Sequence, residues 1–110
     1  MALMFEIKDG VTQIVYNVRV VFENDRYGLN DCLVNEGKPM VEFYDTRYKV
    51  GDKKEREIGQ FASRYYLSTL LRSDNDGLCL DGRVRDWQIC GSTFRQVKQK
   101  LTDIAKVFEV

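Results

Sequence analysis

Residues 14–22 read Ile-Val-Tyr-Asn-Val-Arg-Val-Val-Phe, and this stretch decides the fold. Large apolar side chains stand at every second position, with the polar groups of Asn17 and Arg19 between them. A period of two is typical of a strand that is buried on one side. A slip of one residue would turn these apolar groups into water, so the pattern also specifies the register of the strand. The residues expected on the buried side are Ile14, Tyr16, Val18, Val20 and Phe22.

Shorter segments on either side repeat this alternation. Residues 4–8 and 40–44 carry apolar groups in the same rhythm, and residues 29–34 form a weaker strand interrupted by polar side chains. Asp9-Gly10 stands between the first two strands and is a hairpin-turn signal. We therefore expect an antiparallel β-meander of about four strands in the N-terminal half of the chain.

The apolar rhythm lengthens to a helical period after residue 57. Ile58, Phe61, Ala62 and Tyr65 fall on one stripe at helical pitch, which predicts a helix over residues 58–71. The leucines near its C-terminal end fall towards the opposite side. The last turns of this helix would then contact other structure on two sides.

A hairpin and a second helix are expected to close the chain. Residues 78–80 and 87–89 flank a turn and predict a short β-hairpin. Between residues 94 and 108 the apolar groups lie within an arc of about 100° at helical pitch. Thr93 and Gln96 match a capping box at the start of this segment. The sequence thus predicts a C-terminal amphipathic helix packed on the sheet, and a single α+β domain over residues 1–110.

Several kinds of chemistry are excluded by the composition. The chain has no histidine, which removes Ser–His and Cys–His catalysis and histidine-based zinc sites. It also lacks the glycine-rich motifs that bind phosphates. The polar loop at residues 74–77 fits no EF-hand, because Arg72 and Arg83 would occupy ligand positions. We expect no catalytic residues, no metal site and no cofactor.

Charge and cysteine content bear on partners and location. Seventeen basic residues balance seventeen acidic ones, so there is no excess charge to attract duplex nucleic acid or to keep copies of the chain apart. No stretch reads as a signal peptide or as a membrane span, and three widely spaced cysteines form no disulfide framework. We expect a cytoplasmic protein, in a small, linker-free format typical of bacteria or viruses.

Two features suit contact with another protein. Arginine precedes tyrosine three times, and both side chains offer large contact area and directed hydrogen bonds. The rear leucines of the predicted helix would remain uncovered in a single copy, and the one tryptophan is a candidate anchor. Alternatively, these tyrosines cover sheet edges, the arginines pair with acids and the tryptophan belongs to the core. The candidate interface residues are Leu67, Leu70, Leu71, Arg26, Tyr27, Arg47, Tyr48, Arg64, Tyr66 and Trp87.

These features lead to one functional hypothesis and two rivals. We predict a non-enzymatic interaction protein that forms a homodimer or binds another protein, without a membrane. The first rival is a small-molecule-binding or carboxylate-based enzymatic domain with a pocket between the sheet and the first helix. Its lining would be Tyr16, Tyr44 and Tyr65, with Glu42 or Arg64 supplying polarity. A weaker rival is single-stranded nucleic-acid binding through the Arg-Tyr surfaces.

Overall fold

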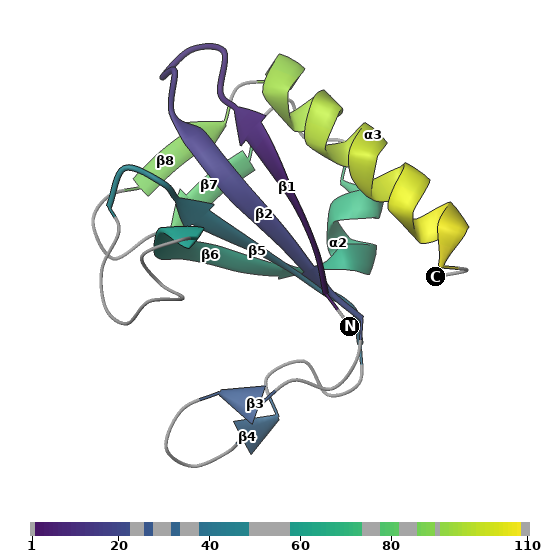
Figure 1. The fold of residues 1–110 in the computed structure, drawn as a ribbon. Helices are drawn as coiled ribbons and strands as arrows, with labels where there is room; N and C mark the ends of the chain where they lie inside the picture. The colour runs from purple at the N-terminus through teal and green to yellow at the C-terminus, as the bar shows by residue number, and fades with distance from the viewer. Residues whose placement is uncertain are drawn as a thin grey trace.

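A four-stranded antiparallel sheet with the strand order β1-β2-β5-β6 forms the centre of the molecule (Figure 1). The computed structural model describes residues 2–22, 26–27, 32–33, 38–48, 58–73, 78–81, 86–89 and 91–108. The strands of the sheet are β1 (Ala2–Lys8), β2 (Val15–Val21), β5 (Met40–Asp45) and β6 (Gln60–Tyr66). Helix α2 (Leu67–Arg72) continues directly from β6, and helix α3 (Gly91–Val107) closes the chain. The short strands β3 (Arg26–Tyr27) and β4 (Cys32–Leu33) pair with each other, as do β7 (Leu78–Asp81) and β8 (Asp86–Ile89).

The predicted α+β fold is confirmed. The strands expected at residues 4–8, 14–22 and 40–44 are β1, β2 and β5, and the expected hairpin is β7 with β8. The C-terminal amphipathic helix is α3, which begins slightly earlier than predicted. Of the weak strand at residues 29–34, the structure describes only β4, which lies outside the main sheet. The fourth strand of the sheet is therefore not the one expected.

The helix predicted over residues 58–71 is wrong for most of its length, because this segment forms β6 and only then α2. The pairing of β5 with β6 shifts register between Phe43 and Tyr44, which is the mark of a β-bulge. The bulge inserts one extra residue, so Ala62 and Tyr65 both reach the core although they are three residues apart, and Phe61 and Arg64 share the opposite face at the same spacing. That spacing imitates a helical period. Gly59 precedes the strand with φ +101°, a conformation that no helix contains.

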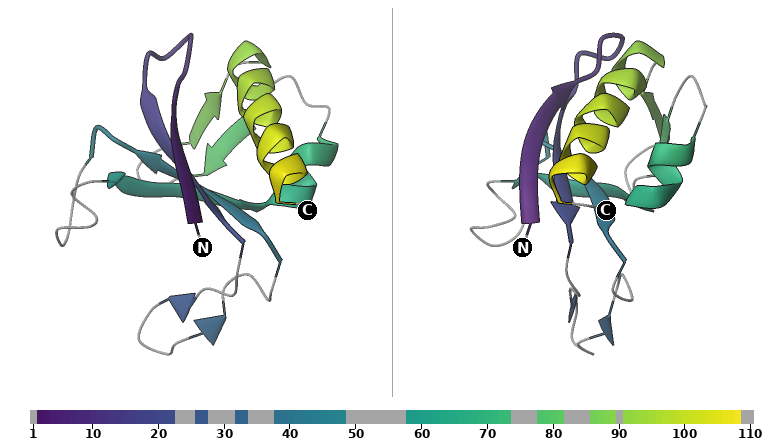
Figure 2. Two further views of the ribbon diagram at one scale, coloured as in Figure 1. Left: turned by 45° about the vertical axis from the view of Figure 1, so that its right-hand side comes forward. Right: turned by 90° about the vertical axis from the view of Figure 1, so that its right-hand side faces the viewer.

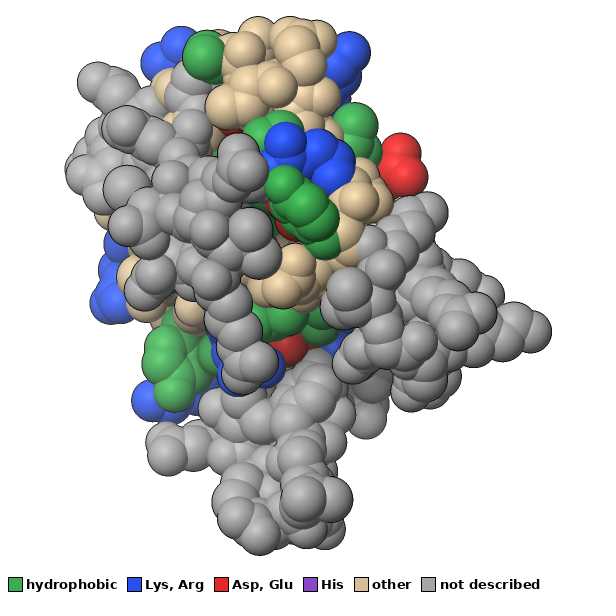
Figure 3. All heavy atoms as spheres, turned by 90° about the vertical axis from the view of Figure 1, so that its left-hand side faces the viewer, with side chains coloured by type: hydrophobic (Ala, Val, Ile, Leu, Met, Phe, Trp, Pro, Cys, Tyr) green, Lys and Arg blue, Asp and Glu red, His purple; other side chains and the backbone are tan. Residues whose placement is uncertain are grey.

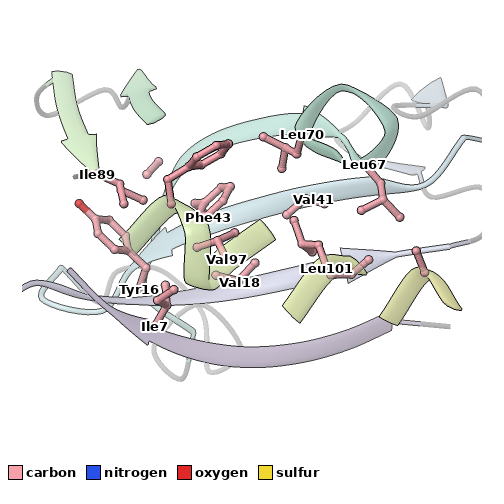
Figure 4. Packing of buried hydrophobic residues seen from close by; sticks show 14 of the residues in the cluster. Ile7, Tyr16, Val18, Val41, Phe43, Leu67, Leu70, Ile89, Val97 and Leu101 are labelled. Carbon is pink, nitrogen blue, oxygen red and sulfur yellow. The ribbon is translucent and has the colours of Figure 1, made fainter. Parts of the chain in front are cut away.

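The two faces of the sheet differ in what covers them. On the inner face, α3 packs its apolar side against the alternating residues of the strands (Figure 2). The core includes Val18, Val41 and Phe43 of the sheet with Val97 and Leu101 of α3 (Figure 4). The opposite side of the sheet, called the outer face below, presents the other set of alternating residues. On β2 and β5 the residues that pair across this outer face are Asn17 with Tyr44, Arg19 with Glu42, and Val21 with Met40.

The loop between β1 and β2 is tied to the start of α3. The buried carboxylate of Asp9 accepts hydrogen bonds from the backbone N–H groups of Val11 and Thr12, at 2.9 and 2.8 Å. The N–H of Gly10 donates to Oγ1 of Thr93 at 3.1 Å. Thr93 lies within α3, so it is not the helix cap that the sequence predicts. Its hydroxyl instead links the β1–β2 loop to the first turn of α3.

Candidate binding surface

Three charged side chains form one cross-strand row on the outer face. Arg19 of β2 stands opposite Glu42 of β5, and Glu42 stands opposite Arg64 of β6. We call these three residues the arginine row. The row forms because each of the three side chains points to the outer face of its own strand, and the pairing of the strands places the three residues side by side. On β1, the remaining strand of the sheet, Met4 stands opposite Arg19.

Glu42 is 1% exposed and accepts hydrogen bonds at both oxygens. Its Oε1 lies 2.7 Å from Nη1 of Arg19 and 3.1 Å from the hydroxyl of Tyr44, and both groups donate to it. Its Oε2 accepts from Nε and Nη2 of Arg64, at 3.2 and 3.0 Å. The carboxylate is therefore occupied in holding two guanidinium groups in place. This is a positioning role, since a general base or nucleophile needs a lone pair directed at a substrate.

The environment of Tyr44 is set by the same carboxylate. Burial of the phenol, and then the charge of Glu42, raise the pKa of Tyr44 to about 12. The phenol therefore stays protonated and remains a donor to Glu42 over the physiological range. Its ring meets that of Phe61 edge to face, with centroids 5.9 Å apart.

Apolar groups stand beside the arginine row at both edges of the sheet. Phe61 on β6 is 37% exposed and Met4 on β1 is 48% exposed. The guanidinium carbon of Arg64 lies 5.1 Å from the centroid of the Phe61 ring, within the range of a cation–π contact. Figure 3 views the molecule from the left-hand side of Figure 1, and shows Lys and Arg side chains among hydrophobic ones. The outer face thus combines directed cationic donors with accessible apolar area.

The predicted interface leucines do not form a surface. Leu67 and Leu70 are 0% and 1% exposed, and both point into the core between α2, the sheet and α3 (Figure 4). Leu71 is partly buried and packs against the same cluster. The prediction of an uncovered rear side is wrong because the segment before these leucines is a strand. The short helix α2 therefore turns them inward, beneath α3.

The Arg-Tyr pairs separate in the structure. Arg64 joins the arginine row, whereas Tyr65 lies on the inner face beside Phe43, with ring centroids 5.9 Å apart. Tyr66 stands opposite Met40 on the outer face, with the ammonium group of Lys38 5.5 Å from its ring centroid. Arg26 and Tyr27 lie in β3 and Trp87 in β8, but their side chains fall outside the described part of the structure.

Arg47 and Tyr48 lie at the end of β5, away from the arginine row. The guanidinium of Arg47 donates to the carboxylate of Asp45, with Nη2 and Oδ2 3.3 Å apart, and lies 5.0 Å from the Tyr48 ring centroid. The buried Tyr16 belongs to the same end of the sheet. Burial, followed by the charges of Asp45 and Asp9, raises the pKa of Tyr16. This cluster contains the one described cation–π contact between an arginine and the tyrosine that follows it.

The residues predicted to line a pocket between the sheet and the first helix do not come together. Tyr16 and Tyr65 belong to the inner face, where they join or pack against the hydrophobic core. Tyr44, Glu42 and Arg64 stand on the outer face, on the other side of the sheet. Side chains on opposite faces cannot line one cavity.

Sequence reasoning missed Arg19, and it named Glu42 only as a source of polarity in the rival pocket, although both residues carried a signal of the row. Arg19 is a long polar side chain inside the strand with the clearest alternation, and Glu42 is a single acid within the apolar run at residues 40–44. An isolated acid of this kind in a strand needs a partner if it is buried. Matching it with the arginine of a neighbouring strand required the register, which only the structure provides.

Comparisons with protein families, with curated proteins and with solved structures find no match for this chain. Among the described residues, no three Cys, Asp or Glu side chains gather closely enough to hold a metal ion. Within the same residues, neither helix combines the length and the apolar character that a bilayer crossing needs.

Proposed function

We propose that this chain is a non-catalytic protein-binding module, and that the outer face of its sheet contacts an acidic segment of another protein. The observation that carries the proposal is the arginine row, in which buried Glu42 holds Arg19 and Arg64 on either side. The proposal keeps the predicted protein-binding role and moves it to a different surface. The predicted cytoplasmic location stays a prediction.

The first argument is preorganisation. The side chains of Arg19 and Arg64 are 24% and 27% exposed, so each is mostly packed but still reaches the surface. Their bonds to Glu42 restrict side-chain rotation before any partner arrives. An immobilised side chain would otherwise cost about 0.5–1.5 kcal/mol on binding, and that cost is reduced when the side chain is already held.

The second argument is charge. Two guanidinium groups and one carboxylate leave the arginine row with a charge of +1, whereas the whole chain has none. The guanidinium N–H groups of the row match the acceptor oxygens of a partner that presents carboxylates. Single-stranded nucleic acid is a poorer match, because its affinity depends on neutralising several phosphates along a groove.

The third argument is the apolar area on the two edge strands, beside the row. Met4 lies on the edge strand β1 and Phe61 on the opposite edge strand β6, both on the outer face. With neighbouring strands about 4.8 Å apart, three intervals span roughly 14 Å across the sheet. Phe61 pairs with Tyr44 rather than Glu42 and so lies about 7 Å further along the strand, which makes the separation roughly 16 Å, the length of about five extended residues. The matching segment has acidic residues at its centre and apolar residues at its ends.

The experiment is a titration of the ¹⁵N-labelled protein with a synthetic peptide of repeated Leu-Glu-Glu units, followed by NMR. We expect shifts at the arginine side-chain Nε groups of the row and at Phe61. Arg64→Gln and Phe61→Ser should each weaken the response at least about three-fold, which is the scale of a single exposed contact. Arg95→Gln is the matched control, since Arg95 is an exposed arginine on α3.

Two results would overturn the proposal. One is a response that maps to α3, or that is as strong in Arg64→Gln as in the wild type. The other is tighter binding of oligo-dT than of the acidic peptide at the same ionic strength, which would assign the face to nucleic acid. Arg64→Lys retains the charge, so it provides a second variant if Arg64→Gln destabilises the fold.

A further inference from the structure

Strand β1 is an edge of the main sheet, and it is long and regular. It has seven residues, contains neither proline nor glycine, and pairs with β2 without a register shift. It forms one end of the strand order (Figure 1), and it lies along one side of the described ribbon in the right-hand view of Figure 2. Natural edge strands usually carry a bulge, a proline or an inward-pointing charge that discourages further pairing. The described part of β1 has none of these three devices, and its only protection of this kind is the pair of exposed charges on Glu6 and Lys8.

The register shows which backbone groups of β1 face outward. The N–H of Asp9 donates to the carbonyl of Ile14 at 2.8 Å, and its carbonyl accepts from the N–H of Gln13 at 2.9 Å, so both backbone groups of Asp9 are directed at the chain that leads into β2. Hydrogen-bonded and non-hydrogen-bonded pairs alternate along an antiparallel ladder. The pairs made by Ile7, Phe5 and Leu3 are therefore directed at β2. The residues between them, Ala2, Met4, Glu6 and Lys8, direct their N–H and C=O groups away from β2.

We propose that β1 pairs with β1 of a second copy of this chain, antiparallel and around a two-fold axis at Phe5. In this register Met4 stands opposite Glu6 of the second copy, and Ala2 stands opposite Lys8. All four outward residues of each strand then exchange hydrogen bonds. The result is a continuous eight-stranded sheet in which both copies keep α3 on the same side.

Other registers are less favourable. Moving the axis to Glu6 places two like charges directly opposite each other, which is destabilising in a sheet. Moving it to Met4 leaves Lys8 of each copy without a partner. The register centred on Phe5 avoids both defects and uses the full length of the strand.

The side chains favour a second copy as the occupant. At the axis, Phe5 meets Phe5 in a non-hydrogen-bonded pair, where side chains approach most closely. Leu3 and Phe5 are only partly covered in a single copy, and Met4 is 48% exposed. The absence of net charge removes long-range repulsion between copies.

The test is sedimentation equilibrium of the full chain under reducing conditions, from about 10 to about 500 µM, where mass action displays a weak dimer. The wild type should show concentration-dependent dimerisation. Glu6→Pro removes an outward N–H without removing a bond to β2, and should be monomeric over this range. Glu6→Ala keeps that N–H and should still dimerise.

A pair of charge variants tests the register itself. Met4→Glu places a second carboxylate opposite Glu6, whereas Met4→Lys places an ammonium group there, and the contact occurs twice per dimer. Both variants lose the same apolar area, so the dissociation constant should be at least about five-fold higher for Met4→Glu than for Met4→Lys. A wild type that is monomeric at the highest concentration, or a dimer that neither Glu6→Pro nor Met4→Glu weakens, would overturn the inference. Either outcome leaves the proposed function of the outer face unaffected.

Discussion

Replacing Glu42 with glutamine is the most direct test of how the outer face is built. The carboxylate is 1% exposed, and from the described residues it accepts four hydrogen-bond contacts, two at each oxygen. Glutamine has nearly the same shape but only one acceptor oxygen. If that oxygen faces Arg19 and Tyr44, the amide N–H groups confront the donors of Arg64. The substitution therefore converts two attractive contacts into donor–donor contacts and removes the negative charge between two cations.

The expected loss follows from the contacts and from their exposure. A hydrogen bond to a charged group contributes about 1.5–3 kcal/mol, and two of them are lost. Removing one partner of a fully buried ion pair costs about 3–5 kcal/mol. Both arginines are roughly one-quarter exposed and can turn part of their charge into water, which lowers this cost. We expect the free energy of unfolding to fall by about 2–4 kcal/mol, a large part of the stability of a small domain.

Urea unfolding followed by far-UV circular dichroism measures this loss. The matched control is Glu6→Gln, an exposed acid on the same face, which should change stability by no more than about 0.5 kcal/mol. A triple variant, Arg19→Met with Glu42→Leu and Arg64→Met, should be close to the wild type, because apolar replacement of a whole buried ion cluster is often neutral. A loss below about 1 kcal/mol in Glu42→Gln would show that solvent, rather than this carboxylate, satisfies the arginines.

Four further substitutions test other parts of the structure. Gly59→Ala should cost at least about 2 kcal/mol in chemical unfolding, since φ is +101° and the new Cβ would lie 2.4 Å from the carbonyl oxygen of Asp45. Gly10→Ala, whose Cβ would meet nothing closer than 3.8 Å, should be within about 1 kcal/mol of the wild type. Leu67→Glu should unfold the chain, with loss of the circular dichroism signal, because it buries a charge in the core. A variant that stays folded and changes its oligomeric state would instead support the predicted interface at the leucines. Because the folded pKa of Tyr44 is about 12 and the unfolded value is 10.0, the stabilising contribution of Tyr44 should be complete below about pH 10 and be lost as the pH rises towards 12, so the stability of Tyr44→Phe should fall less steeply over this interval.

Much of the fold could be predicted because burial on one side imposes a simple rhythm. The alternation at residues 14–22 specified both the strand and its inward face, and Tyr16, Val18 and Val20 are almost completely buried. The helical rhythm after residue 94 specified α3 for the same reason. The error at residues 58–66 has a definite origin, because the bulge in β6 turned a period of two into a spacing of three. A bulge depends on the partner strand, so one segment alone does not reveal it.

The candidate site was less predictable, because a cross-strand row depends on three registers at once. The sequence singled out Arg64, but it linked this residue to its neighbouring tyrosines rather than to Glu42. Strand alternation in fact separates consecutive residues, so an arginine and the tyrosine after it point to opposite faces of β6. The Arg-Tyr motif was therefore visible in the sequence. Within a strand, however, an arginine and the tyrosine that follows it cannot belong to the same surface.

The two proposed surfaces have a joint consequence. A two-fold axis perpendicular to the sheet keeps both outer faces on one side, so a β1-paired dimer would present two arginine rows on one continuous face. A partner with two acidic segments could then bind both rows, and its second contact would form at a local concentration near the millimolar range. We expect a tandem Leu-Glu-Glu peptide with a flexible linker to bind the wild type at least about ten-fold more tightly than the single peptide does. Glu6→Pro should remove this gain while leaving the affinity for the single peptide unchanged, because that variant keeps the arginine row and loses only the pairing edge. Isothermal titration calorimetry with both peptides measures the difference. An equal tandem gain in the wild type and in Glu6→Pro would mean that the two rows do not act through β1 pairing.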